Sequence, residues 1–366
     1  MCTVPLRLLL YFEAQNEFRV IIINTYDTES YSVSPVARRQ RVGSPVARRQ
    51  TVDSPVARRQ RVEEYVARSG FHWSIAEPPS TRTQQANIMN TCAGIGRPAN
   101  GIQNIADSYE LFITPEIITI VTIETNRRAN KVIMAWSELH PNQDTPQTWR
   151  QTDNVEIKAF IGLLLLAGVH RSKNESVSEL FFPFGNSIFR ATMSLKRFSN
   201  LTRFCRFDNI DTRHQRMPDD KLAPIRDIWT MFVARLQICY KPGESMTIDV
   251  PIRGRCSFRK YIPSKPGKYG IKIFWCCDSS TSYPLNGEAY LGRQPSGAQA
   301  NPATHGSLGI ELVKGLVNPW INSGHNITMD NFSTGADFVI DMLSVRITRV
   351  GTIGTNRREV AQELKK

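Results

Sequence analysis

The chain has 366 residues, of which 41% are hydrophobic and 22% are charged, so we expect two folded domains or one large domain with flanking segments. Its formal net charge of +13 and its pI of about 9.6 favour an anionic partner, nucleic acid first. Seven cysteines without a C-x-x-C pair argue against a zinc finger and a secreted disulfide framework, and the longest apolar run, 11 residues over 159–169, is too short for a membrane span.

The first 70 residues are dominated by a basic repeat. Residues 1–33 stay unassigned apart from one predicted strand at 18–23. From Ser34 the motif Ser-Pro-Val-Ala-Arg-Arg-Gln occurs three times at a spacing of ten residues, and residues 34–68 hold nine arginines against three acidic residues. A proline in each copy and a period too short for a shared core predict a disordered basic linker over residues 34–70. Its arginines could bind phosphate groups, but a recently expanded tract explains the repeat at least as well.

Residues 71–239 are predicted to be mainly helical after an irregular stretch that ends near residue 105. Apolar spacing predicts helices at 116–133 and 155–167, the second capped by Asp153 or Asn154. A third helix within 193–207 alternates basic and apolar residues. Its basic residues, all candidate DNA contacts, are Lys196, Arg197, Arg203 and Arg206. A helix with its arginines in water and its apolar side chains inward fits the same pattern equally well.

From residue 240 the pattern becomes that of a sheet. The predicted elements are strands at 246–249, 270–278 and 283–291, a helix at 308–317, a strand at 327–330, a helix at 336–343 and a strand at 346–354. The pair Asn286-Gly287 leaves open whether 283–291 is one strand or a hairpin. Three strands followed by alternating helices and strands is the order in which a ribonuclease H-like domain begins. We therefore expect a mixed α+β and α/β fold, with a helical N-terminal region before an incomplete ribonuclease H-like domain.

Two aspartates, Asp249 and Asp330, end strands of this region. In a ribonuclease H-like domain these are the places of the first and second catalytic carboxylates. Two carboxylates on neighbouring strands form a site for a divalent metal such as Mg²⁺. The third carboxylate of that fold lies on the helix after the last strand, and the sequence reaches Lys366 soon after its last strand. We therefore expect the domain over 240–366 to lack its last helix and its third carboxylate.

Short motifs follow one another from residue 159 onward. They include Ala-Phe-Ile-Gly-Leu-Leu (159–164), Phe-Asp-Asn (207–209), Asp-Lys-Leu (220–222), Tyr-Lys-Pro-Gly-Glu (240–244), Thr-Ile-Asp (247–249), Arg-Gly-Arg-Cys (253–256), Tyr-Ile-Pro-Ser-Lys-Pro (261–266), Lys-Tyr-Gly-Ile-Lys (268–272), Cys-Asp-Ser (277–279), Tyr-Leu-Gly-Arg (290–293) and Thr-Met-Asp-Asn (328–331). Each is weak alone. As an ordered set they resemble piggyBac-type transposases and the proteins derived from them, from about residue 71 onward.

The resemblance implies a DDE recombinase ancestor, in which three acidic residues hold the metal ions that cut and join DNA ends. It assigns Asp249 and Asp330 as catalytic metal ligands and Mg²⁺ as the ancestral metal. It also implies double-stranded DNA as the partner, a homodimer, a nuclear location, and a dimerisation and DNA-binding region over 71–239. The candidate DNA contacts in the region that follows are Arg253, Arg255, Lys265 and Lys268.

Three features depart from the family pattern. The third acidic residue would lie beyond Lys366, and the cysteine-rich zinc module has no counterpart here. In addition, Val250-Pro251-Ile252 replaces an acidic residue and a longer path after the first aspartate, and Pro251 removes a backbone donor near the metal ligands. Loss of one of three ligands should lower catalysis by orders of magnitude.

These features predict a transposase-derived protein that binds DNA and does not catalyse transposition. Two alternatives stay open. The chain could be a fragment of an active DDE transposase that cuts and joins DNA ends by two-metal-ion phosphoryl transfer, or a transposon remnant without a function. An unrelated metal-dependent nuclease is a distant fourth hypothesis.

Overall fold

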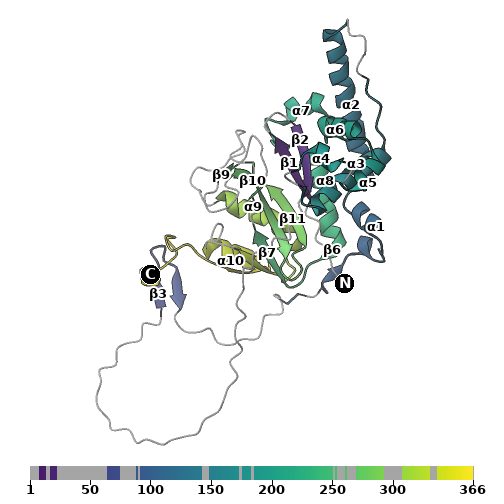
Figure 1. The fold of residues 1–366 in the computed structure, drawn as a ribbon. Helices are drawn as coiled ribbons and strands as arrows, with labels where there is room; N and C mark the ends of the chain where they lie inside the picture. The colour runs from purple at the N-terminus through teal and green to yellow at the C-terminus, as the bar shows by residue number, and fades with distance from the viewer. Residues whose placement is uncertain are drawn as a thin grey trace, which may run out of the picture.

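The computed structural model describes residues 8–13, 17–22, 64–74, 88–89, 91–141, 148–172, 175–182, 185–249, 252–253, 260–261, 269–291, 307–329 and 336–365. In these ranges a helical region adjoins a mixed sheet, and two hydrophobic cores form (Figure 1). None of the helices in this part of the chain is long and apolar enough to cross a membrane.

Helices make up most of residues 105–239. Their bounds are α1 Ile105–Glu110, α2 Pro115–Leu139, α3 Asn154–Val169, α4 Val177–Leu180, α5 Ser187–Thr192, α6 Leu195–Phe204, α7 Ile210–Arg216 and α8 Arg226–Cys239. The three helices predicted from apolar spacing are confirmed as α2, α3 and α6. Helix α2 continues beyond the predicted end at residue 133, because Met134, Ala135 and Leu139 are good helix formers.

Side-chain caps set where α3 and α6 begin. The Asp153 carboxylate accepts a hydrogen bond from the backbone N–H of Glu156 at 2.7 Å, as the sequence predicts. The Ser194 hydroxyl accepts from the backbone N–H of Arg197 at 3.2 Å. Each cap satisfies a donor that the first helical turn leaves without a partner. Local sequence thereby fixes the positions of Glu156 and Arg197, each the third residue of its helix.

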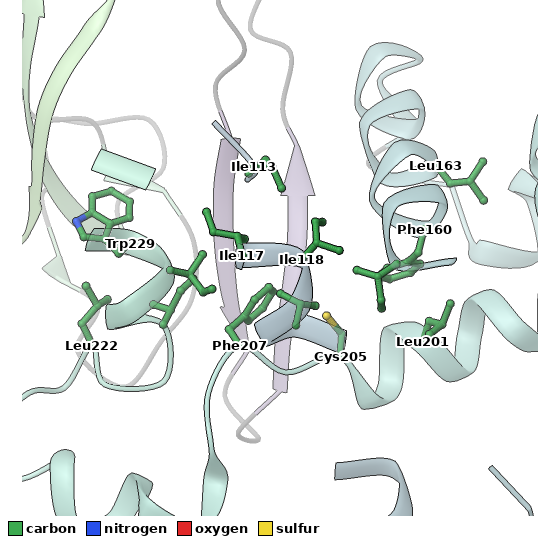
Figure 2. Close-up of a cluster of buried hydrophobic side chains, with 14 of the residues drawn as sticks. Ile113, Ile117, Ile118, Phe160, Leu163, Leu201, Cys205, Phe207, Leu222 and Trp229 are labelled. Carbon is green, nitrogen blue, oxygen red and sulfur yellow. The ribbon is translucent and has the colours of Figure 1, made fainter. Parts of the chain in front are cut away.

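The helices share one core, which Figure 2 shows in close-up. Ile118 of α2, Phe160 of α3, Leu201 of α6 and Trp229 of α8 are buried in it. Full burial of such a side chain contributes roughly 1.5–3 kcal/mol. The hairpin of β1 (Leu8–Glu13) and β2 (Glu17–Ile22) lies against α3, and β2 confirms the strand predicted near the N-terminus.

The sheet is formed by residues 245–351. Its strands run in the order β11 (Pro284–Ala289), β10 (Tyr269–Asp278), β7 (Ser245–Asp249), β12 (Asn326–Met329) and β13 (Thr348–Gly351). Strand β10 is antiparallel to both of its neighbours, whereas β12 is parallel to β7 and to β13. The short strands are β3 Glu64–Val66, β4 His72–Ser74, β5 Gly94–Ile95, β6 Tyr240–Lys241, β8 Ile252–Arg253 and β9 Lys260–Tyr261.

The two faces of the sheet pack against different layers. On one face, Met246 of β7 and Ile327 of β12 join a core completed by α9 (Ser307–Val317) and α10 (Ala336–Ser344). On the other face, Trp275 of β10 packs against the helical core. Trp229 of α8 also donates its indole N–H to the backbone oxygen of Gly287 at 3.2 Å. The helical region therefore supports the sheet directly.

The pair Asn286-Gly287 lies inside β11, so residues 283–291 contain a single strand and the hairpin alternative is wrong. Asn286 donates its amide N–H to the backbone oxygen of Leu316 at 2.7 Å. A Cβ atom on Gly287 would lie 2.5 Å from the Trp275 ring. Close packing on the neighbouring strand therefore explains this glycine, and no turn is needed.

A small hairpin ties an early segment to the end of the described chain. Strands β3 and β4 pair antiparallel, and the indole N–H of Trp73 donates to the backbone oxygen of Glu359 at 2.6 Å. The backbone N–H of Ser69 donates to the oxygen of Arg358 at 3.3 Å. The buried side chains of this contact are Ala67, Val360 and Ala361. We call residues 64–74 together with 357–364 the clasp. The rest of the predicted linker, residues 34–63, lies outside the described residues.

Candidate functional site

Two strands end side by side where the sequence predicts metal ligands. Strands β7 and β12 are parallel neighbours, with Ile248 in register with Met329. Asp249 is the last residue of β7 and is exposed. Asp330 follows Met329 directly but lies outside the described residues. The register therefore brings the two strand ends together, while the pairing of the carboxylates stays a prediction.

Alternation along β7 turns Asp249 away from the sheet core. Met246 and Ile248 are buried, whereas Thr247 lies on the opposite side and shares a hydrogen bond of 2.8 Å with the Ser279 hydroxyl. A carboxylate at this strand end offers hard oxygen ligands, which suit Mg²⁺. Within the described ranges no three His, Cys, Asp or Glu side chains gather into a metal-binding group. A metal at Asp249 would thus need ligands from outside those ranges, and Asp330 is the candidate.

The start of β7 is held by Asp278, a residue that the sequence did not single out as a site residue. The Asp278 carboxylate accepts the backbone N–H of Gly243 at 2.7 Å. It also accepts the Ser280 hydroxyl at 2.7 Å and both the N–H and the hydroxyl of Thr281, at 2.9 and 2.8 Å. Burial raises the pKa of Asp278, but these hydrogen bonds outweigh burial and lower it overall. The run of hydroxyl residues after a buried strand was the available sequence signal.

Two of the four DNA contacts predicted within residues 193–207 are exposed to solvent, and both belong to α6. Lys196 and Arg203 are exposed, and with Ser199 they follow helical spacing along one face. The Arg203 guanidinium also lies over the Phe204 ring, 5.2 Å from its centroid. These side chains are placed as phosphate-binding residues of a helix would be.

The other two predicted contacts on this segment are buried. The Arg197 guanidinium makes two hydrogen bonds to the Glu156 carboxylate, of 2.7 and 2.5 Å, and stacks over the Trp149 ring at 4.4 Å. Arg206 is 2% exposed and donates to the backbone oxygen of Cys205 at 2.8 Å. Both guanidinium groups therefore have structural roles within the helical region, and among the four residues only Lys196 and Arg203 are exposed.

The ion pair of Glu156 and Arg197 predicts a loss of stability in acid. Hydrogen bonding from Arg197 is the main reason that the pKa of Glu156 falls to about 2, from 4.5. Since the folded state holds the ionised form, this stabilisation is complete above pH 4.5 and is lost as pH falls toward 2. We expect the loss to approach 3 kcal/mol, because one pKa unit corresponds to about 1.4 kcal/mol. Urea unfolding of the wild type and Glu156→Gln between pH 6 and 2 measures it.

A suitable control is Glu110→Gln, because Glu110 forms an exposed ion pair with Lys158. We expect the Glu156→Gln variant to be less stable at pH 6 and to show a flatter pH profile than the wild type. An unchanged slope below pH 4.5 in Glu156→Gln would show that another carboxylate causes the acid dependence.

A hollow of about 660 Å³ lies where α3 and α6 begin. Arg150, Glu156 and Arg197 line it, and Arg150 also binds the Glu156 carboxylate at 2.7 Å. The one carboxylate thus pairs with two guanidinium groups, and the three side chains together keep a net charge of +1. The charged groups that line the hollow therefore bind one another. Among these three residues, only Arg150 has a largely exposed side chain.

The remaining predicted DNA contacts fall in or near the undescribed parts of the sheet region. Arg253 belongs to β8, which pairs with β10 through Ile271. Arg255, Lys265 and Lys268 lie outside the described residues. Their roles stay predictions.

The motif residue Asp208 has a structural partner set that the sequence did not reveal. Its buried carboxylate binds the Arg213 guanidinium through two contacts, one of 3.1 Å, and it also accepts from Arg216 at 2.7 Å. Arg216 in turn donates to the backbone oxygen of Ala223 at 2.9 Å. The network fixes α7 against the loop that leads into α8.

Comparison with known proteins places the chain in a family. Residues 106–366 match the family model DDE_Tnp_1_7, described as Transposase IS4. The chain is also similar to the piggyBac transposase in a cryo-EM structure of its synaptic complex with hairpin DNA, with 35% sequence identity and a TM-score of 0.66 over 75% of this chain. The match covers 56% of that transposase, so this chain spans little more than half of its length.

Proposed function

This chain belongs to the transposase family described as Transposase IS4, and we propose that its function is to bind double-stranded DNA. The observation that carries the proposal is the similarity, over 75% of the chain, to a transposase whose structure was solved in a complex with hairpin DNA. The exposed Lys196 and Arg203 of α6 supply a surface for it, and the net charge of +13 favours a polyanion.

The DNA-binding proposal predicts a strong dependence on salt. Each phosphate contact releases counterions, so a plot of log affinity against log salt concentration falls with a slope of about −0.9 per contact. We expect the double variant Lys196→Ala, Arg203→Ala to bind duplex DNA more weakly and to reduce that slope by about 2. Fluorescence anisotropy at several salt concentrations measures both effects.

A matched control is the double variant Lys158→Ala, Lys314→Ala, which also removes two positive charges. These two lysines lie outside α6 and pair with Glu110 and Asp341. We expect the control to keep most of the wild-type slope. Wild-type affinity that does not fall with salt would contradict phosphate binding altogether. Equal effects of the two double variants would assign binding to net charge instead of to α6.

We further propose that residues 240–366 form a ribonuclease H-like domain in which Asp249 and Asp330 bind a divalent metal, Mg²⁺ in the ancestor. Support comes from the adjacent ends of β7 and β12 and from the carboxylate chemistry of the two residues. A bound metal would stabilise charge on a phosphate oxygen. A nuclear location and a homodimer complete the proposal, and they follow from DNA as the partner and from the family.

We propose that this chain does not itself cut DNA. Pairing of β7 with β10 stops at Asp249, and β8 resumes pairing at Ile252. Val250 and Pro251 stand between them, with no acidic residue and with one backbone donor fewer beside the candidate metal ligand. An active transposase of which this chain is a part is the second candidate, and the 56% coverage of the solved transposase favours it.

A nicking assay separates the two candidates. Supercoiled plasmid is incubated with the chain and Mg²⁺ or Mn²⁺, beside the variant Asp249→Asn. We expect no cleavage above the level of that variant, because the segment after Asp249 offers no acidic residue and one backbone donor fewer. Clear cleavage that Asp249→Asn abolishes would support the active transposase.

A further inference from the structure

The C-terminal half of α2 contributes no fully buried side chain to the helical core. All six buried residues of this helix lie between Ile117 and Ala129, and none lies in its last ten residues, Asn130–Leu139. Figure 1 shows this end of α2 extending past α6 and α7. Met134 is 64% exposed there. A helix end with an exposed large apolar side chain and no fully buried residue is a candidate contact surface.

The exposed face on this half of α2 is complementary to the same face of a second copy of the helix. Lys131, Met134, Ala135 and Glu138 are all exposed and follow the spacing i, i+3, i+4 and i+7, which places them on one helix face. Consider two copies of α2 packed antiparallel about a two-fold axis between residues 134 and 135. Lys131 of each copy then lies beside Glu138 of the other. The same axis places Met134 of each copy beside Ala135 of the other, so one arrangement pairs opposite charges and a large side chain with a small one.

We propose that this face of α2 is the surface through which two copies of the chain associate, an inference that rests on the proposed homodimer. The contact is isologous, as a two-fold axis requires. Ala135 lets the helix axes approach to the roughly 8–10 Å of ordinary helix packing. Lys131 binds Asp211 of α7 at 2.5 Å, and its ammonium group has further N–H donors for Glu138 of the other copy.

The interface is small. It involves about two helical turns of each copy, well below the roughly 800 Å² per partner of a standard interface. Association in the absence of DNA is therefore weak and depends on protein concentration. The charges at its two ends set which way the helices run, because parallel packing would place like charges together.

Sedimentation equilibrium of the full chain without DNA, over a wide range of concentration, tests the interface. We expect the wild type to dimerise and Met134→Glu to stay monomeric. Glu138→Lys should weaken the dimer by about tenfold, because it places two lysines together at both ends of the contact. The double variant Lys131→Glu, Glu138→Lys restores opposite charges at both ends of the contact but gives up the ion pair with Asp211, so it should recover most of the dimerisation that Glu138→Lys loses.

Ile105→Glu is the control, because Ile105 is an exposed apolar residue of α1 that is not part of the face. It should dimerise like the wild type. A wild-type chain that stays monomeric throughout overturns the proposal, and so does a double variant as weak as Glu138→Lys. All substituted positions are exposed, and circular dichroism of each variant is the test that it folds. Because no DNA is present, these outcomes are independent of the DNA-binding test.

Discussion

Replacing Asp208 by alanine is expected to lower the free energy of unfolding by about 3–5 kcal/mol, the usual effect of removing one partner from a buried ion pair. The Asp208 carboxylate is 1% exposed and is shared by Arg213 and Arg216. Without it, the guanidinium of Arg213, whose side chain is 9% exposed, would stay buried with no compensating charge. Urea unfolding followed by circular dichroism measures the change.

Asp211→Ala is the matched control for this prediction. Asp211 lies three residues further on and also pairs with a basic residue, Lys131, but the two side chains are 48% and 60% exposed. An exposed pair of this kind contributes about 0–1 kcal/mol. Similar losses in Asp208→Ala and Asp211→Ala would refute the buried network as a source of stability.

Replacing Asp278 by alanine is expected to destabilise the protein by roughly 3 kcal/mol and to loosen β7 selectively, since hydrogen bonds to a charged group contribute about 1.5–3 kcal/mol each. The substitution leaves the backbone N–H groups of Gly243 and Thr281 without their acceptor. Gly243 lies two residues before β7, the strand that ends at Asp249. The substitution therefore loosens the start of β7, and the candidate metal ligand Asp249 lies at the other end of the same strand.

Hydrogen exchange of the backbone amides reports this effect. We expect faster exchange in β7 of the Asp278→Ala variant, little change in α3, and an intermediate result for Asp278→Asn, which keeps one acceptor oxygen. The exposed Asp219→Ala serves as a control. Uniformly faster exchange across the chain would mean that Asp278 supports global stability and has no special effect on β7.

Much of the fold followed from local pattern. The Asp153 cap and the apolar run after it predict α3, and the β-branched stretch before Asp249 predicts β7. The order of the longer strands and helices from residue 245 to residue 351 was predicted in the same way, whereas the two-residue strands β8 and β9 were not predicted. Local pattern failed at Gly287, because the requirement for glycine comes from the Trp275 ring on a neighbouring strand. The Asn-Gly pair reads the same in the sequence whether its glycine forms a turn or makes room for a neighbouring ring.

The candidate site was predicted only in part. Asp249 lies at the expected strand end, and the parallel register with β12 brings the two strand ends together. Among the basic residues of α6, the sequence could not separate exposed from buried ones, because Arg197 is buried by a partner, Glu156, that lies 41 residues earlier. Asp278 was missed for a similar reason, since its main contact is the backbone of Gly243, 35 residues away.

The clasp has a consequence for the order in which the chain folds. The bond from Trp73 to Glu359 joins residues 286 positions apart, so it closes a loop that encloses both hydrophobic cores. Such a contact has a high entropic cost until the intervening chain is compact. During synthesis the β3–β4 hairpin emerges first among the parts of the clasp but has no docking surface until residues 357–364 are made. The β3–β4 hairpin is thus synthesised early but docks last, after the helical region and the sheet have folded.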